Sequence, residues 1–331
     1  MQKLLLSIGI PTYNGSKHIK EALDSIVAQI KGIEQEIEIV ISDNASTDET
    51  PQIIKEYQSQ YPIIRYFRNE ENLGFDKNVD LLFKRAQGKY VWLLSDDDTL
   101  EKNSISVLLN KLTEYKNTSV VFLNYAECDI NMKEYPHRQR ADIYQDIYCE
   151  NGDIFFQRSK FLFGLISSLV IETEAWNQSD VAKYIGGGFV HVGVLVEILQ
   201  NHSALIISDK LVNLRTPETG NERWRPHGYS ATLQPGFELV KIFKGMKDLG
   251  YEKKTYTYLI DNMYRANLKT ILCVNLYGVN NKKEIAVNMI KSYGRYPTFW
   301  LIHLPFLLTP HIVFKMLRRI KHFLNNSISK K

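Results

Sequence analysis

The first 125 residues alternate short apolar runs with amphipathic segments, and this alternation constrains the fold more than any other feature of the chain. Short runs rich in β-branched and aromatic residues predict strands at 4–10, 36–42, 63–67, 90–95 and 120–125. Helical spacing of apolar residues predicts helices at 18–30, from 50 onward and at 77–86. Thr50 is the expected N-cap of the second of these helices, with Pro51 at its first helical position. Strand–helix alternation of this kind implies an α/β fold with a doubly wound, mainly parallel sheet and helices on both faces.

The rest of the chain follows a less regular pattern. Helices are predicted at 152–163, 192–200 and over most of the chain after 235, with strands at 167–172 and 204–208. A chain of 331 residues can form one large domain with an appendage. We therefore expect an α/β domain over 1–230, in two halves at 1–125 and 126–230, and a helical C-terminal extension over 231–331.

Cysteine usage and charge exclude several classes of protein. The three cysteines are widely spaced and form no CxxC pair, which indicates reduced thiols in a cytoplasmic protein. The apolar start is too short for a signal peptide and runs directly into Pro11. The net charge of +4 comes from the last 17 residues, which hold six Lys or Arg and no acid, whereas the other 314 residues carry −2. We therefore expect no nucleic-acid partner.

An acidic triplet, Asp96–Asp98, ends the apolar run Tyr90–Ser95. This places three carboxylates at the C-terminal edge of a strand, where open α/β sheets bind ligands. Clustered hard oxygens there suit a divalent cation that bridges two phosphates. Alternatively, Asp98 and Glu101 form a capping box for the following helix. That alternative leaves Asp96 and Asp97 as a repulsive pair unless a cation offsets their charge.

Three loops, Pro11–Gly15, Asp43–Asp48 and Ser95–Asp98, follow the first, second and fourth predicted strands. In a doubly wound sheet such loops converge on one crevice. A nucleotide there would contact backbone groups and Tyr13, and Asp43 would accept a hydrogen bond from a pyrimidine N–H or a ribose hydroxyl. The alternative is that the Asn, Asp and Gly residues of these loops are turn formers only.

The motifs in these loops resemble those of the family 2 glycosyltransferases of the GT-A fold. They are SIGIPTYN at 7–14, EIVISDNASTDET at 38–50, NLG at 72–74 and GKYVWLLSDDD at 88–98. The resemblance implies inverting transfer from a nucleotide-diphosphate sugar, usually with Mg²⁺ or Mn²⁺. The SDDD form is similar to abequosyltransferase-like members that act in O-antigen or capsule synthesis.

The resemblance also implies roles for individual positions. Residues expected to line the nucleotide sugar are Pro11, Thr12, Tyr13, Asn14, Asp43, Asn72, Gly74 and Asp76, with Asp43 at the base. The usual metal motif of the family is Asp-x-Asp-Asp, and here Ser95 replaces its first Asp. Asp97 and Asp98 match the two later positions and are the expected metal ligands, while Asp96 fills the variable position beside the donor.

Inverting transfer needs a general base that deprotonates the acceptor hydroxyl. The family commonly supplies it from a Glu-Asp pair after a Gly-Gly-Phe segment. Here Gly186–Phe189 is followed by His191 where the Asp is expected, and the next acid is Glu197. Histidine has a suitable intrinsic pKa, so His191 is the first candidate, with Glu197 and then Asp180 behind it. The alternative is a histidine packed for structural reasons.

The polar segment 219–225 is a second candidate element. Arg223 would clamp the diphosphate and Trp224 would stack on a sugar as the loop closes. An exposed, salt-bridged loop is the alternative.

The apolar segment 299–314 precedes the basic tail. With two prolines and two histidines it is a poor transmembrane helix, which needs about 20 apolar residues. An interfacial anchor on anionic lipid fits better, and a core-packing helix with a solvated basic end is the alternative. Peripheral association with the inner leaflet would suit a cytoplasmic enzyme that extends a lipid-linked glycan acceptor.

Two other functions remain open from the sequence. A nucleotidyltransferase uses a similar sheet and carboxylates, but it would normally show a glycine-rich loop with a basic residue after the first strand, which Pro11–Gly15 lacks. A non-catalytic scaffold that binds a nucleotide sugar at the membrane is suggested by the missing Glu-Asp pair.

Overall fold

The computed structural model describes residues 4–135, 143–159, 162–216, 234–277, 282–310 and 313. The chain divides into two compact units, one comprising Met1–Thr216 with Met246–Thr255 and the other Pro217–Gly245 with Tyr256–Lys331. The domain boundary expected at residue 230 falls outside the described residues and stays a prediction.

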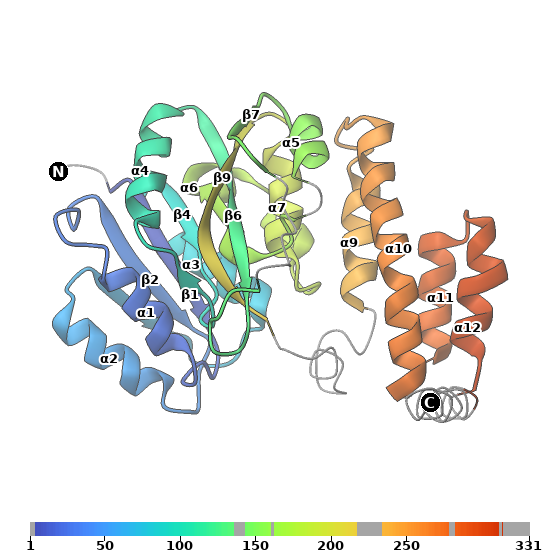
Figure 1. Ribbon diagram of the computed structural model, residues 1–331, viewed down its shortest axis with the longest axis horizontal. Helices are drawn as coiled ribbons and strands as arrows, with labels where there is room; N and C mark the ends of the chain where they lie inside the picture. The colour runs from blue at the N-terminus through green and yellow to red at the C-terminus, as the bar shows by residue number, and fades with distance from the viewer. Residues whose placement is uncertain are drawn as a thin grey trace, which may run out of the picture. The chain divides into compact units, whose positions relative to one another are not determined.

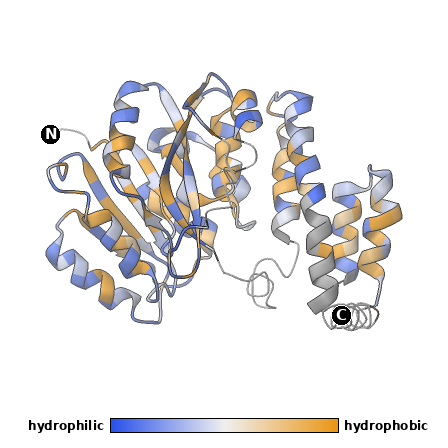
Figure 2. Ribbon diagram, viewed as in Figure 1, coloured by the Kyte–Doolittle hydropathy of each residue, from blue (hydrophilic) through white to orange (hydrophobic). Residues whose placement is uncertain are grey.

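The first unit is built on one mixed sheet (Figure 1). Its strands are β1 (Leu6–Thr12), β2 (Ile37–Asp43), β3 (Ile64–Arg68), β4 (Tyr90–Leu93), β5 (Thr99–Leu100), β6 (Thr118–Cys128), β7 (Ile147–Cys149), β8 (Leu169–Glu172) and β9 (Ser203–Arg215). Their order in the sheet is β3-β2-β1-β4-β8-β6-β9-β5, with β7 paired to β9. Buried aliphatic and aromatic residues make up most of β1, β2, β4, β6 and β8, and Figure 2 colours many residues of the sheet orange.

Strands β3, β2, β1 and β4 are parallel, as the sequence predicts. Ile8 of β1 pairs with Ile39 of β2 on one side and with Trp92 of β4 on the other. The carboxyl ends of β2, β1 and β4 therefore meet at one edge of the sheet. β8 runs antiparallel between β4 and β6, so the sheet as a whole is mixed.

Helices cover both faces of this sheet (Figure 1). They are α1 (Ile19–Val27), α2 (Thr50–Gln60), α3 (Phe75–Arg85), α4 (Ser104–Glu114), α5 (Gly152–Arg158), α6 (Thr173–Gln178) and α7 (Val190–Ile198), with 3₁₀ turns η1 (Ile166–Ser168) and η2 (Val181–Tyr184). Helix α1 packs with α2, whereas α3 packs with α6 and α7. Trp176 of α6 stacks on Phe83 of α3 with ring centroids 3.8 Å apart, which fixes these two helices together.

Two local predictions are wrong. The capping box of Asp98 and Glu101 does not form, because Thr99–Leu100 pairs with β9 and helix α4 begins only at Ser104, after Asn103. Thr50 is the first residue of α2 rather than its N-cap, which is Glu49. In both places a tertiary contact or a neighbouring turn takes the polar side chain that the local pattern assigns to the helix.

The second unit is helical among the residues that the structure describes. Its helices are α9 (Gln234–Gly245), α10 (Lys253–Tyr277, whose first turn belongs to the first unit), α11 (Lys282–Tyr293) and α12 (Leu304–Leu308), the last preceded by a π-helical turn, η4 (Phe299–His303). Tyr264 of α10 stacks on Tyr296 with ring centroids 4.3 Å apart. Within the described ranges, every helix is too short or too polar to cross a membrane.

Candidate active site

The loops after β1, β2 and β4 lie together at the carboxyl edge of the sheet, as the sequence predicts. Strands β1 and β2 stay in register to their ends, where Thr12 pairs with Asp43. The N–H of Asn44 then donates to the carbonyl of Thr12 at 2.9 Å. The Thr12 hydroxyl donates to the Asp96 carboxylate in the loop after β4, so side chains from all three loops form one connected site.

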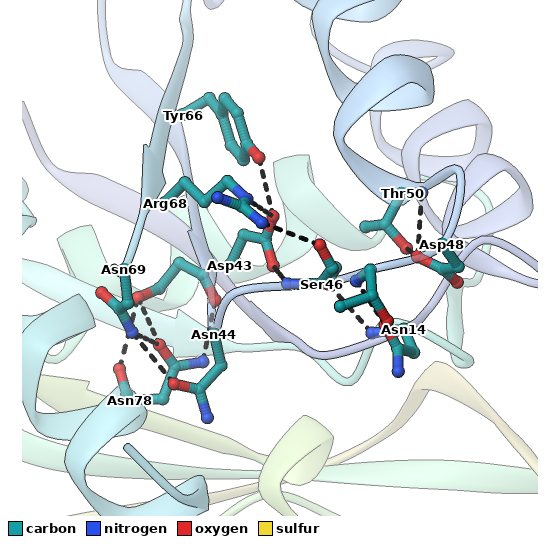
Figure 3. A network of polar contacts seen from close by, with 12 residues as sticks. Asn14, Asp43, Asn44, Ser46, Asp48, Thr50, Tyr66, Arg68, Asn69 and Asn78 are labelled. Carbon is teal, nitrogen blue, oxygen red and sulfur yellow. Dashed lines mark hydrogen bonds and ion pairs between the residues drawn. The ribbon is translucent and has the colours of Figure 1, made fainter. Parts of the chain in front are cut away.

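Asp43 builds the loop after β2 (Figure 3). Its side chain is fully buried. One carboxylate oxygen accepts from the Ser46 N–H at 2.8 Å and the other accepts from the Tyr66 hydroxyl at 2.7 Å, with the Arg68 Nε 3.6 Å away. Burial and the Asp43 charge raise the pKa of Tyr66 well above its ordinary value. Asp43 therefore shapes the loop, and both of its oxygens are engaged in this conformation.

Asn14 joins the loop after β1 to the loop after β2 (Figure 3). It adopts a left-handed conformation with φ of 55°, which asparagine tolerates better than most residues. Its N–H donates to the Ser46 hydroxyl at 2.9 Å, and its side-chain oxygen accepts from the Thr47 N–H at 2.8 Å. The Tyr13 ring beside it is 48% exposed, so it is available to a ligand.

Asparagine side chains extend this network to the start of α3. Asn72 Oδ1 accepts from the Asn44 side chain at 2.7 Å and from the Gly74 N–H at 2.9 Å. Gly74 has a φ of 82°, a conformation that favours glycine. The structure thus brings Asn72 and Gly74 beside the loop after β2, and their predicted contact with a nucleotide sugar stays a prediction.

Asp96 lies against the loop after β1. Burial raises the pKa of Asp96 to about 6, the Thr12 hydrogen bond opposes this, and the Asp97 charge adds to it. Gly15 packs so closely here that a Cβ at this position would overlap Asp96 Oδ2 and Thr12 Oγ1. Glycine at position 15 therefore makes room for the acidic loop.

Asp98 is held on both oxygens by protein donors. The Ser167 hydroxyl donates to Oδ2 at 2.5 Å and the Arg215 N–H donates to Oδ1 at 2.9 Å. Burial and the nearby Asp97 charge raise its pKa, against these hydrogen bonds. The Arg215 side chain also donates from Nε to the Asp97 carbonyl at 2.8 Å and pairs with Glu21 at 2.6 Å. Asp98 and Arg215 therefore fix the backbone of the acidic loop.

Asp97 is half-buried, as Asp96 is, whereas Asp98 is buried. Its Oδ1 accepts from the Ser95 hydroxyl at 2.5 Å, and its Oδ2 accepts no hydrogen bond from any residue that the structure describes. Across those residues no group of three or more His, Cys, Asp or Glu side chains is arranged to hold a metal. The donor set still fits a cation that takes its other ligands from a bound phosphate, as Mg²⁺ often does.

Asp76 anchors a glycine-rich segment from the second half of the unit. Its Oδ2 accepts from the N–H groups of Gly186 and Gly188 at 2.7 and 2.8 Å, and its Oδ1 accepts from the Val190 N–H at 3.1 Å. Val190 is the first residue of α7, so Asp76 satisfies a free N–H at the start of that helix. The structure gives Asp76 this positioning role.

His191, the first candidate base, points into the protein. Only 2% of it is exposed, its Nε2 lies 3.1 Å from the Gly164 carbonyl, and its ring contacts those of Phe75 and Phe189. Burial lowers the pKa of His191 to about 4, although the Gly164 carbonyl opposes this. The ring is therefore neutral at physiological pH and is enclosed in this conformation.

Glu197, the second candidate base, ties η2 to α7. Its two oxygens accept from the Asp180 N–H at 2.9 Å and from the Tyr184 hydroxyl at 3.0 Å, and Lys183 lies 3.5 Å away. Asp180 itself is exposed. Arg223 and Trp224 lie outside the described residues, so their predicted roles stay predictions.

Two residues of the site have no motif in the sequence. Ser167 contacts Asp98 across 69 residues of chain and Arg215 contacts it across 117. Ser167 falls inside a segment that reads as a strand, and Arg215 lies beyond the predicted end of its strand. The pairing of β8 with β4 and β6, and of β9 with β6 and β5, brings them to the acidic loop.

Comparison with known proteins identifies the family. Residues 7–184 match the family described as "Glycosyl transferase family 2". Abequosyltransferase RfbV of Salmonella typhimurium is 34% identical over 224 residues, which cover 64% of this chain and 67% of that protein. Glycosyltransferase GlyG of Streptococcus pneumoniae is 28% identical over 182 residues, which cover 53% of this chain and 58% of that protein.

Solved structures share the fold. S. aureus TarS 1-349 in complex with UDP-GlcNAc matches with a TM-score of 0.60 at 16% identity, over 90% of this chain and 76% of that one. Mannosyltransferase PcManGT from Pyrobaculum calidifontis, in complex with GDP-Man and Mn²⁺, matches with a TM-score of 0.57 at 15% identity, over 93% of this chain and 86% of that one. The predicted GT-A fold is confirmed. The chain belongs to glycosyl transferase family 2 and is a glycosyltransferase.

Proposed function

We propose that this glycosyltransferase moves a sugar, with inversion, from a nucleotide diphosphate to a hydroxyl of a lipid-linked glycan during surface-polysaccharide synthesis. The observation that carries the proposal is Asp97 Oδ2, which accepts no hydrogen bond from any described residue, whereas protein donors hold the carboxylates of the adjacent Asp96 and Asp98. The similarity to an abequosyltransferase supports the polysaccharide class. The proposal places the enzyme in the cytoplasm, at the inner face of the membrane.

The donor would lie across the three loops at the carboxyl edge of the sheet. The exposed Tyr13 ring offers a face for the base, beside backbone groups of Pro11 and Thr12. Asp43 acts here mainly by holding its loop, and it reaches a base directly only if Tyr66 yields its place. Asn72 and Gly74 would border the ribose and the diphosphate.

Asp97 and Asp98 are the proposed metal ligands, with Asp97 the readier of the two, because each Asp98 oxygen already accepts a hydrogen bond in this conformation. Bound Mg²⁺ or Mn²⁺ would neutralise charge on the leaving diphosphate. Ser95 fixes the Asp97 rotamer through its hydroxyl, while Arg215 fixes the Asp97 carbonyl. Asp96, whose pKa burial raises to about 6, would border the diphosphate, and a nearby cation would favour its ionised form.

Each candidate base would have to leave its present contacts before it could accept a proton from the acceptor. His191 would have to leave the Gly164 carbonyl and its aromatic neighbours to reach an acceptor hydroxyl. Glu197 would have to release Asp180 or Tyr184. These engagements favour, as the second candidate function, a scaffold that binds a nucleotide sugar without transferring it.

Thermal unfolding with UDP-, CDP-, dTDP- and GDP-sugars, each with and without Mn²⁺, tests the donor site. A ligand at a hundredfold excess over its Kd stabilises by about 2.7 kcal/mol, or roughly 5–10 °C for a unit of this size. We expect one nucleotide to give a metal-dependent rise that Asp97→Asn abolishes and the exposed control Asp209→Asn keeps. Retention of the metal-dependent rise in Asp97→Asn would refute the metal assignment.

Transfer and binding are separated by a second assay on the same protein. Release of nucleoside diphosphate from the donor identified above is followed with membrane extract as acceptor source. Donor binding with turnover supports the enzyme. Donor binding without turnover supports the scaffold, provided that the same acceptor extracts sustain a related transferase.

A further inference from the structure

The last described helix of the second unit buries only a narrow stripe. Phe299, His303 and Leu307 are at most 5% exposed, and their spacing of four residues places them on one side of the continuous turn η4 and helix α12. The His303 ring lies 4.4 Å from the ring of Tyr264, whose hydroxyl contacts Nδ1 at 2.8 Å. The segment is therefore docked firmly by this one side.

The rest of the segment presents large apolar side chains to solvent. Trp300, Leu301 and Leu308 are 49%, 77% and 55% exposed, and Figure 2 shows the hydrophobic character of α12. Helix α11, which packs against α12, adds Val287 and Ile290, which are 49% and 40% exposed. Trp300 sits over Gly294 just beyond the end of α11, so the two sets form one face. Soluble monomers rarely expose a continuous apolar patch of this kind.

Two polar groups of η4 and α12 are hydrogen-bonded within the unit. The Trp300 indole N–H donates to the Gly294 carbonyl at 2.9 Å. The Thr309 hydroxyl donates to the Pro305 carbonyl at 2.8 Å. Because these two donors already have acceptors, a medium that offers no hydrogen bonds leaves neither of them unpaired.

The charge pattern indicates what covers the face. Residues 299–314 contain no Asp, Glu, Lys or Arg, and the chain then continues into 315–331, which has six Lys or Arg and no acid. An apolar helix face that is followed in the chain by a cluster of cations suits an anionic lipid surface. Burial of the apolar face and attraction of the cations to the headgroups both strengthen binding there. A second copy of the chain would instead bring two cationic segments together, which opposes association.

We propose that the face formed by Trp300, Leu301, Leu308, Val287 and Ile290 inserts into the interface of an anionic membrane, with the basic segment that follows it on the headgroups. This membrane-binding face would bring the enzyme to a lipid-linked acceptor, so its purpose rests on the proposed function. Lipid binding itself requires neither donor, metal nor transfer.

Vesicle co-sedimentation of the full chain tests the proposal. The probes are vesicles of phosphatidylcholine alone and of phosphatidylcholine mixed with phosphatidylglycerol. We expect binding to the mixed vesicles that weakens with salt and falls on the order of 100-fold in the double variant Leu301→Asp with Leu308→Asp. The matched control is Tyr144→Asp, at an 85% exposed aromatic of the first unit, which should bind like the wild type.

Three results would overturn the inference. They are undiminished vesicle binding by the folded double variant, equal binding to neutral and mixed vesicles, and a concentration-dependent dimer that the double variant abolishes without any lipid binding. The donor-induced thermal shift is measured on the same proteins. If the thermal shift persists in a protein that has lost vesicle binding, the proposed function stands. If the thermal shift is absent while vesicle binding is intact, the result counts against the proposed function alone.

Discussion

Replacing His191 by glutamine removes a buried titratable ring and keeps a donor for the carbonyl of Gly164. The pKa of His191 is lowered from 6.5 to about 4, chiefly by burial. The Gly164 carbonyl and the Asp76 charge raise the pKa of His191 against this burial. The other neighbours are the uncharged rings of Phe75 and Phe189. As pH falls from 6.5 towards 4, the unfolded chain takes up a proton at this position that the folded chain does not. The free energy of unfolding therefore falls across this window.

The size of the effect follows from the two pKa values. A difference between 6.5 and about 4 corresponds to about 3 kcal/mol of stability, lost progressively as pH drops through the window. Urea unfolding at a series of pH values gives the free energy directly. We expect the wild type to lose about 3 kcal/mol more than His191→Gln between neutral pH and pH about 4. Other histidines contribute equally to both proteins and cancel.

The control is His202→Gln, at an exposed histidine, which should keep the wild-type pH dependence. Parallel stability curves for wild type and His191→Gln would refute the reasoning that the ring is held neutral by burial. Transfer rates above neutral pH then decide its chemical role. A general base contributes roughly 10²–10⁴-fold, so a loss of that size with unchanged stability identifies the base, and a rate within a few-fold of wild type assigns His191 to packing.

Three further substitutions test the loops of the site. Asp76→Ala should lower the free energy of unfolding by about 3 kcal/mol, because three backbone N–H groups lose their acceptor. Asp76→Asn should lower the free energy of unfolding by less. Equal losses for the two variants in urea unfolding would contradict this. Arg215→Lys should weaken the metal-dependent donor shift more than it lowers overall stability, since lysine lacks the planar fork that serves separate partners; an unchanged donor shift would contradict it. Gly15→Ala should displace Asp96 and lower stability by about 1–3 kcal/mol, whereas Gly245→Ala, with open space around it, serves as control; equal unfolding midpoints for the two variants would contradict the close packing.

The sequence predicts the parts of the site that depend on order along the chain. Alternating strands and helices place the loops after β1, β2 and β4 at one edge, and the register of Thr12 with Asp43 confirms it. The partners of Asp98 could not be predicted in this way. Ser167 and Arg215 reach it through β8 and β9, and the pairing of these strands depends on tertiary contacts rather than on a local pattern.

The sequence could not decide between the catalytic and the packed alternative for His191, and it did not predict the full extent of β9. The middle of β9, at 208–210, is polar, and the register of β9 with β6 shifts there, so a short apolar run at 204–208 marks only its beginning. His191 reads as a catalytic candidate because it occupies a motif position. Its neighbours Phe75 and Gly164 come from distant segments, and only the folded chain shows that they enclose it.

The segment held by Asp76 has a consequence for how such an enzyme can diversify. Gly186 and Gly188 have φ of 104° and 75° and must stay glycine, and their N–H groups with that of Val190 are fixed by one carboxylate. Positions 187 and 189 carry no such requirement. Related sequences can therefore differ at these two positions while the backbone of the segment keeps its path.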